Sequence, residues 1–199
     1  MRIGVLGGTF DPIHLGHLIV AETVREHEAL DLILFIPAGT PWHRDRAPVA
    51  SAAQRLSMVN LAVAGNPGFA ASARDVERAG PTYTVDTLEA VQRDHPGARL
   101  LFLLGQDALA QIGSWRDPAR IADLADLVAL SRPGAPPIDL AALHPAIPDA
   151  PLRVKVVETP LIGISATMIR ARVRAGHSIR YLVPDPVADF IEAERLYRR

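Results

Sequence analysis

The chain contains no cysteine. This absence excludes disulfide bridges, thiol catalysis and zinc sites built from cysteine ligands. Charge of one sign is not in excess either, because the formal net charge is -1 at pH 7. A large nucleic-acid-binding surface is therefore not expected, since such surfaces need clustered positive charge.

Long apolar runs are missing as well. No segment approaches the roughly 20 consecutive apolar residues that a membrane-spanning helix needs. The N-terminal MRIGVLGG has one arginine and an apolar run too short for a signal peptide. We therefore expect a cytoplasmic protein with no membrane partner. The length of 199 residues suits a single domain over residues 1–199 and is compatible with a homo-oligomer.

Short apolar runs alternate with segments in which apolar residues recur at helical spacing. Strands are predicted at residues 3–6, 32–37, 68–73, 99–105, 126–131 and 153–159. Helices are predicted at 15–27, 51–63, 84–95 and 165–174, and also from 117 and from 185 onward. This alternation predicts an α/β fold, a doubly wound Rossmann-like parallel sheet flanked by helices with right-handed crossovers.

Several helix starts carry local signals. Ser51 followed by Gln54 predicts a capping box, and Asp117 before Pro118 predicts an N-cap with proline at the first helical position. Thr84 and Ser165 are further candidate N-caps. The proline-rich residues 133–151 predict an irregular connection.

The first candidate site is the segment GGTFDPIHLGH at residues 7–17. It follows the first predicted strand, and ligands in doubly wound sheets bind outside the C-terminal strand ends. Gly7 and Gly8 let the backbone approach a ligand, and the next helix aims free N–H groups at the same space. His14 and His17 lie on one side of that helix start. Such imidazoles are good partners for phosphate oxygens.

Two other interpretations of the histidines remain open. A zinc-binding pair has this spacing, but the sequence shows no obvious third ligand and no cysteine. Alternatively, both histidines are incidental polar residues at a helix start. Phosphate binding is the favoured interpretation, because the pair brackets Gly16 directly behind a glycine-rich turn.

The second candidate site is GISATMIR at residues 163–170. Ser165 and Thr167 offer hydroxyls at a predicted helix start, and Arg170 follows about one and a half turns later. Taken alone, the segment could equally be an ordinary cap followed by a surface arginine. Two anion-ready helix starts in one small α/β chain favour a polyphosphate held from both sides.

Together these motifs resemble those of the H-x-G-H nucleotidyltransferase superfamily. GPTYTVDTL at 80–88, GQDAL at 105–109, SW at 114–115, SRPG at 131–134 and RYLVP at 180–184 follow in an order that is similar to the bacterial nicotinate mononucleotide adenylyltransferases. The resemblance covers essentially the whole chain. The two phosphate motifs point to the superfamily, whereas the Tyr-Thr-x-Asp-Thr segment and the tryptophan point to the nicotinate branch.

The resemblance implies transfer of the AMP moiety of ATP to nicotinate mononucleotide, which yields the deamido dinucleotide and pyrophosphate on the route to NAD. It implies Mg²⁺ delivered with ATP, no metal ligands of the protein's own, and no covalent enzyme intermediate. An ionised phosphate nucleophile needs no general base, so catalysis would consist of positioning and charge neutralisation.

The resemblance also implies a role for each matching residue. The catalytic residues would be His14, His17 and Arg170. ATP would contact Gly7, Gly8, Thr9, Phe10, His14, Gly16, His17, Arg44, Gly105, Asp107, Ile164, Ser165, Thr167 and Arg170. Nicotinate mononucleotide would contact Thr9, Phe10, Arg44, Thr84, Trp115 and Arg116, with Trp115 stacking on the pyridine ring and Thr84 and the Arg116 N–H receiving the carboxylate.

Simpler roles and departures from the family pattern keep alternatives open. Trp115 could be a packing residue, and Asp11 could be a turn residue beside Pro12 or an ion-pair partner. Arg44 stands where the family usually has lysine. The alternative functions are a related adenylyltransferase acting on nicotinamide mononucleotide or phosphopantetheine, and a non-catalytic ATP sensor.

Overall fold

The computed structural model describes residues 1–41 and 47–198. The strands are β1 (Arg2–Gly8), β2 (Leu32–Pro37), β3 (Thr40–Pro41), β4 (Phe69–Ala71), β5 (Pro81–Thr82), β6 (Arg99–Gly105), β7 (Asp126–Ser131) and β8 (Val154–Glu158). The helices are α1 (Leu15–His27), α2 (Ala52–Val63), α3 (Arg74–Glu77), α4 (Thr84–Asp94), α5 (Gln106–Ala110), α6 (Pro118–Leu124), α7 (Ala150–Arg153), α8 (Ala166–Arg174) and α9 (Asp185–Ala193). Two 3₁₀ turns lie at Ile112–Ser114 and Ala141–Leu143.

The sheet is parallel and six-stranded, in the order β4-β2-β1-β6-β7-β8. The chain begins in the middle, adds β2 and β4 on one side, and then crosses to β6, β7 and β8 on the other. The direction of winding therefore changes between β1 and β6, whose C-terminal ends are Gly8 and Gly105. That switch point is where a doubly wound sheet binds ligands.

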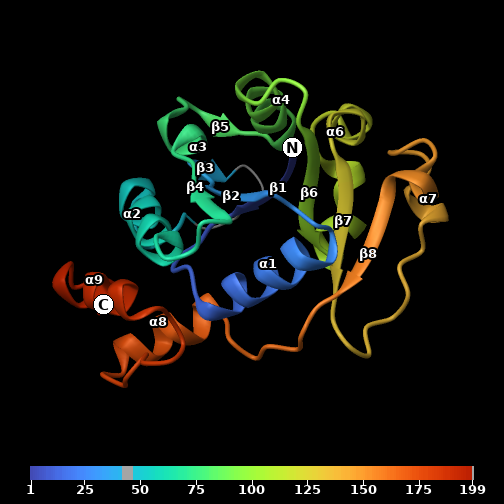
Figure 1. Ribbon diagram of the computed structural model, residues 1–199. Helices are drawn as coiled ribbons and strands as arrows, with labels where there is room; N and C mark the ends of the chain where they lie inside the picture. Colours follow the sequence, from blue (N-terminus) through green and yellow to red (C-terminus); the bar gives the residue numbers. More distant parts are fainter. Residues whose placement is uncertain (42–46, 199) are drawn as a thin grey trace.

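The sheet has a hydrophobic core on each face. Alternate side chains of a strand pack into one core or the other, because successive residues of a strand point to opposite faces. Leu6, Phe35 and Leu103 belong to the face covered by α1, α2, α8 and α9. Val5, Ile36 and Phe102 belong to the face covered by α4 and α6. Figure 1 shows this three-layer arrangement, with α1 lying across one face of the sheet, α9 beside α2, and α8 next to α9.

The α/β fold predicted from the sequence is confirmed, and the six predicted strands are the six strands of the parallel sheet. The capping box of Ser51 and the N-cap at Asp117 are also present. The prediction that Thr84 caps its helix is wrong. Tyr83 occupies the N-cap with an extended backbone, and Thr84 is already the first helical residue. The proline-rich residues 133–151 are irregular apart from a 3₁₀ turn and the start of α7.

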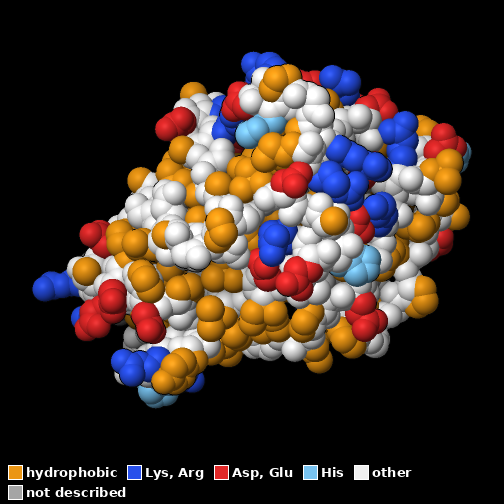
Figure 2. Space-filling view, viewed as in Figure 1, with side chains coloured by type: hydrophobic (Ala, Val, Ile, Leu, Met, Phe, Trp, Pro, Cys, Tyr) orange, Lys and Arg blue, Asp and Glu red, His pale blue; other side chains and the backbone are white. Residues whose placement is uncertain are grey.

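Charges of both signs are interspersed over the face of the molecule seen in Figure 2. Within the described residues, no helix has the length and apolar character required to span a bilayer.

Candidate active site

The first phosphate motif leaves the sheet at the end of β1. Gly8 lies against the ring of Phe10, where an added Cβ would come within 2.8 Å of a ring atom. Phe10 itself has a left-handed backbone (φ 50°) and its side chain is only 3% exposed. Its ring is thus a core residue beneath the loop, and any ligand contact predicted for Phe10 would be made by its backbone.

The two histidines form a compact pair at the start of α1. Their rings stack with centroids 3.7 Å apart, and the ring of His17 meets Phe10 edge-on at 5.1 Å. His14 occupies the N-cap, and its main-chain N–H donates to Nδ1 of His17 at 3.2 Å. This bond assigns the ring proton of neutral His17 to Nε2. Gly16 makes room for the pair, because a Cβ there would lie 3.0 Å from Nδ1 of His14.

Both imidazoles are neutral at pH 7. Burial lowers the pKa of His14 to about 4. Burial, and secondarily the neighbouring His14, lowers the pKa of His17 to about 3. Each ring can therefore offer an N–H to a phosphate oxygen without carrying a net charge.

Two buried charged residues, neither assigned a site role from the sequence, hold the loop between Gly8 and His14. Arg55, 1% exposed on α2, donates to the carbonyl oxygens of Thr9 at 2.8 Å and Gly39 at 3.1 Å. The carboxylate of Asp11, 5% exposed, accepts the N–H groups of Val49 at 2.7 Å and Ala50 at 3.1 Å. Asp11 is therefore a fixed buried acceptor and not only a turn residue.

The second phosphate motif meets the first. Ser165 caps α8 by accepting the N–H of Met168 at 3.2 Å, as predicted. Arg170, one turn into α8, donates from Nη1 to the main-chain oxygen of Asp11 at 2.7 Å and from Nη2 to Thr167 Oγ1 at 3.2 Å. Two motifs separated by most of the chain thus lie side by side.

Other predicted members of this motif are close by. Ile164 packs against the core shared with α1, and the side chains of Ser165 and Thr167 are exposed. The N–H of Leu15, the first residue of α1, donates to the oxygen of Leu182 at 3.0 Å. This bond ties the start of α1 to the segment that follows α8.

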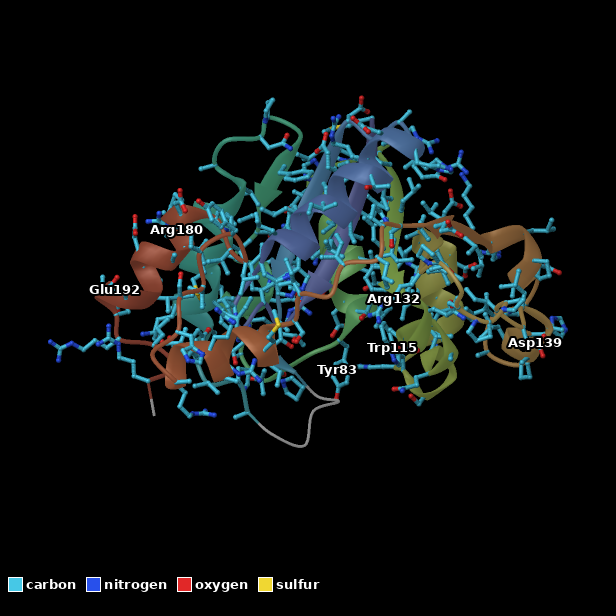
Figure 3. The ribbon with its side chains drawn as sticks, turned by 90° about the horizontal axis from the view of Figure 1, so that it is seen from below. Tyr83, Trp115, Arg132, Asp139, Arg180 and Glu192 are labelled. Carbon is cyan, nitrogen blue, oxygen red and sulfur yellow. The ribbon has the colours of Figure 1, made fainter. Side chains whose placement is uncertain are left out.

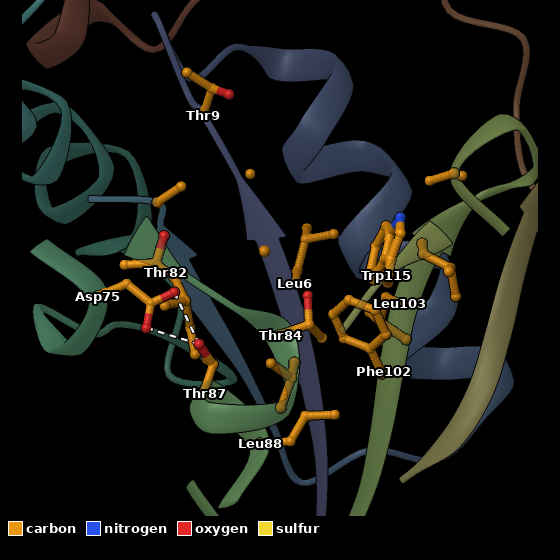
Figure 4. Close-up of a pocket in the computed structure, with 18 residues that line it drawn as sticks. Leu6, Thr9, Asp75, Thr82, Thr84, Thr87, Leu88, Phe102, Leu103 and Trp115 are labelled. Atoms are coloured by element: carbon orange, nitrogen blue, oxygen red, sulfur yellow. Dashed lines mark hydrogen bonds between the residues drawn. The ribbon is translucent and has the colours of Figure 1, made fainter. Parts of the chain in front are cut away.

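A cavity of about 250 Å³ opens beside the first motif. Gly7, Gly8 and Thr9 form one wall, and Thr84 and Trp115 line it from other elements. Trp115 packs edge-on against Phe102, with ring centroids 6.1 Å apart, and remains half-buried. In Figure 4 Thr84 and Trp115 lie near each other, beside the ring of Phe102. The structure therefore brings together three residues predicted to meet the acceptor: Thr9, Thr84 and Trp115.

Asp75 and Thr87 line the same cavity and were not singled out from the sequence as site residues. Thr87 Oγ1 donates to the Asp75 carboxylate at 2.8 and 2.9 Å, as the dashed lines in Figure 4 show. Burial raises the pKa of Asp75, an effect that the Thr87 hydrogen bond and Arg78 oppose. Asp75 is a single acidic residue before the Pro-Thr-Tyr-Thr segment and belongs to no periodic pattern, so the sequence alone does not identify it as a cavity residue.

The side chain of Arg116 does not line this cavity. Its guanidinium lies 4.8 Å from the centroid of the Tyr83 ring and 3.8 Å from Asp86. Any contact with a ligand carboxylate would therefore come from the Arg116 main chain, as expected from the sequence. Figure 3 shows Tyr83 near Trp115, with both well away from Arg180 and Glu192.

A second cavity of about 320 Å³ lies on the other side of β6. Gly105 borders both cavities, and Asp107 and Arg132 line the second one together with Val20 of α1. Predicted ATP-contacting residues therefore occur along the same C-terminal edge of the sheet as the acceptor residues. Arg44 lies outside the described residues. Among residues 1–41 and 47–198, no group of three or more His, Asp or Glu side chains is arranged to hold a metal ion.

Comparison with known proteins agrees with this architecture. The Cytidylyltransferase-like family matches residues 5–172. A "Probable nicotinate-nucleotide adenylyltransferase" of Thermomicrobium roseum is 48% identical over 197 residues, covering 99% of this chain and 92% of the relative. A protein of the same description from Thermus thermophilus is 44% identical over 198 residues, covering 100% of both chains.

Solved structures share the fold. The nicotinic acid mononucleotide adenylyltransferase of Plasmodium falciparum complexed with NaAD has a TM-score of 0.77 to this chain, with 21% identity. The match covers 99% of this chain and 97% of that chain. At this level of identity the similarity is one of fold.

Proposed function

The chain belongs to the Cytidylyltransferase-like family and, within it, to the nicotinate-nucleotide adenylyltransferases, and on this basis we propose how its site works. The protein transfers the adenylyl group of ATP to nicotinate mononucleotide and releases pyrophosphate. One observation supports this assignment most directly. Arg170 of the second phosphate motif is hydrogen-bonded to Asp11 of the first at 2.7 Å, beside a cavity lined by Thr84 and Trp115.

In the proposed reaction, an oxygen of the acceptor's 5′-phosphate attacks the α-phosphorus of ATP. A new P–O bond forms as the bond to the β-phosphate oxygen breaks, and pyrophosphate carries away the negative charge. The acceptor phosphate is already ionised at pH 7, so no base has to remove a proton. The protein lowers the barrier by alignment and by stabilising charge on the phosphates.

The phosphates are the proposed ligands of the two histidines and Arg170. His17, with its proton on Nε2, donates to an α-phosphate oxygen as charge moves toward the leaving group. His14 donates beside it. Arg170, together with Ser165 and Thr167, holds the β- and γ-phosphates, because a guanidinium binds two oxygens at once.

The cavity beside β1 is the proposed acceptor pocket. Trp115 stacks on the pyridine ring, and Thr84 with the main-chain N–H of Arg116 receives the nicotinate carboxylate. Support comes from the placement of Thr84 and Trp115 on the lining of one cavity together with Thr9. We expect Mg²⁺ to arrive bound to ATP and to neutralise phosphate charge there. A cytoplasmic location remains a prediction of the sequence.

The reaction is tested by measuring pyrophosphate release from ATP and Mg²⁺ with nicotinate mononucleotide, nicotinamide mononucleotide, phosphopantetheine or no acceptor. Release with nicotinate mononucleotide far above the others is the expected result. Release with another acceptor would contradict the pocket assignment, and tight ATP binding without release would identify a sensor.

A pair of variants links that activity to the site. Arg170→Ala should lower kcat/KM for ATP by roughly 10- to 100-fold, the usual effect of losing hydrogen bonds to a charged ligand. Arg180→Ala is the matched control, because Arg180 is exposed and lies outside both cavities described above. Equal activity of the two variants would remove Arg170 from the phosphate site.

A further inference from the structure

The chain after α9 folds back to the first phosphate motif. Tyr197 is 3% exposed, and its hydroxyl donates to Asp11 Oδ1 at 2.7 Å across 186 positions of sequence. Its ring belongs to the same core cluster as Phe10 and Ile13, which lie within two residues of Asp11 in the chain. Burial, and next the Asp11 carboxylate, raises the pKa of Tyr197 far above its ordinary value, so the hydroxyl is a neutral donor at pH 7.

Asp11 joins three separate parts of the molecule. Its carboxylate accepts hydrogen bonds from the hydroxyl of Tyr197 and from the N–H groups of Val49 and Ala50. Its main-chain oxygen accepts a hydrogen bond from the Arg170 guanidinium. Tyr197 and Arg170 therefore do not touch the same atom, but both hold the same residue. A displacement of the whole Asp11 residue would therefore move the acceptor of the Arg170 hydrogen bond as well.

The turn that brings the C-terminal residues back to Asp11 requires strained backbone conformations. Arg195 and Tyr197 have left-handed backbones, with φ of 52° and 63°, which non-glycine residues adopt only when their surroundings require it. The N–H of Leu196 donates to the oxygen of Ile191 at 3.0 Å. Glu194 accepts from Gln54 on α2 at 3.4 Å. These bonds place Tyr197 against Asp11, in the loop between Gly8 and His14.

We propose that Tyr197 is a positioning residue for ATP: its hydroxyl fixes the Asp11 carboxylate, and through Asp11 it sets the position of the Arg170 guanidinium that holds the β- and γ-phosphates. The inference rests on the proposed function, in which Arg170 binds those phosphates. It predicts that removing one oxygen atom at Tyr197 weakens ATP binding more than acceptor binding, because Thr84 and Trp115, the proposed partners of the carboxylate and the pyridine ring, have no part in this network.

The test compares Tyr197→Phe with Tyr181→Phe. Tyr181 is a close control, since its backbone is also left-handed (φ 64°) but its side chain is 78% exposed. For Tyr197→Phe we expect KM for ATP to rise by about 3- to 10-fold, as for loss of one hydrogen bond to a charged group that acts indirectly. KM for nicotinate mononucleotide should change by less than about twofold. Tyr181→Phe should match the wild type in both constants.

A double-mutant cycle separates positioning from general loss of stability. If Tyr197 acts through Arg170, Tyr197→Phe should weaken ATP in the wild-type background and have little further effect in an Arg170→Lys background. Additive effects, or equal weakening of both substrates by Tyr197→Phe, would overturn the inference. Unchanged KM for ATP in Tyr197→Phe would do the same.

Binding of a non-hydrolysable ATP analogue, measured by calorimetry, keeps this test independent of turnover. A wild-type protein that binds the analogue but transfers nothing to nicotinate mononucleotide would contradict the proposed reaction. In that case the difference in analogue affinity between Tyr197→Phe and Tyr181→Phe still decides the role of Tyr197.

Discussion

The imidazoles of His14 and His17 stack on each other at 3.7 Å, and the main-chain N–H of the first donates to Nδ1 of the second. Two protonated rings at this separation would repel each other strongly, and burial already disfavours either charge. The pair is therefore held neutral, with the helix N–H groups of α1 supplying the positive end of the site.

Protonation of this pair should destabilise the protein below neutral pH. The pKa of His14 falls to about 4 and that of His17 to about 3 in the folded protein, from an ordinary value of 6.5. Between 6.5 and about 4, the unfolded chain binds protons on these rings and the folded chain does not. The free energy of unfolding should therefore decrease as pH falls from 7 to 5, on the order of 1–2 kcal/mol for each histidine.

Urea denaturation at pH 7, 6 and 5 measures this dependence. A variant carrying His14→Gln and His17→Gln should show a flatter profile over the same range. His144→Gln is the control, because His144 is exposed, and it should keep the wild-type slope. Identical slopes for all three proteins would contradict the assignment of the pH dependence to the pair.

His17→Ala should reduce kcat by roughly 10²–10³-fold, because it removes a donor that acts on charge developing in the transition state. Binding of ATP should remain within severalfold of the wild type. Single-turnover kinetics with ATP and nicotinate mononucleotide separate the two effects. Near-normal turnover of the variant would show that His17 has no part in the chemical step.

The parts of the fold that the sequence predicts are those marked by local signals, such as apolar spacing and helix-capping residues. The apolar spacing of 15–27 matches α1, and the capping box at Ser51 begins α2. In both cases the information lies within a few residues of the element that it specifies. Strands β3 and β5 pair in parallel as a separate two-stranded sheet. Each is only two residues long, too short to carry any periodicity, and the sequence contains no sign of them.

Non-local contacts account for what the sequence does not predict in the site. The two phosphate motifs are visible as patterns, but their union through Asp11 and Arg170 spans 159 positions. The Thr84 prediction failed for a conformational reason. A helix can begin at either of two adjacent residues, and the extended backbone of Tyr83 decides which one is the cap.

Trp115→Ala should weaken binding of nicotinate mononucleotide more than binding of ATP. The ring lines the cavity beside β1 and is held by Phe102, so its loss removes a stacking surface worth roughly 1–3 kcal/mol per base. KM for nicotinate mononucleotide should rise by roughly 5- to 150-fold, with little change in KM for ATP. Trp115→Phe, which keeps an aromatic face, should recover much of the affinity. Equal weakening of both substrates would show that Trp115 only supports the fold.

Thr87→Val should destabilise the protein through Asp75. The substitution keeps the β-branched shape but removes the hydroxyl that donates to both oxygens of a carboxylate that is 7% exposed. A buried carboxylate that loses a donor costs about 1–3 kcal/mol of folding free energy, and the pKa of Asp75, already raised by burial, should rise further.

Urea denaturation of Thr87→Val against Thr23→Val provides the measurement. Thr23 makes a similar hydroxyl bond to a main-chain oxygen within α1, at 2.9 Å to Ile19, but this bond is exposed to solvent and no carboxylate depends on it. We expect Thr23→Val to lie within about 0.5 kcal/mol of the wild type. Because Asp75 and Thr87 line the acceptor cavity, KM for nicotinate mononucleotide should also rise in Thr87→Val and not in Thr23→Val. Equal stability of the two variants would mean that the Asp75 carboxylate is satisfied without Thr87.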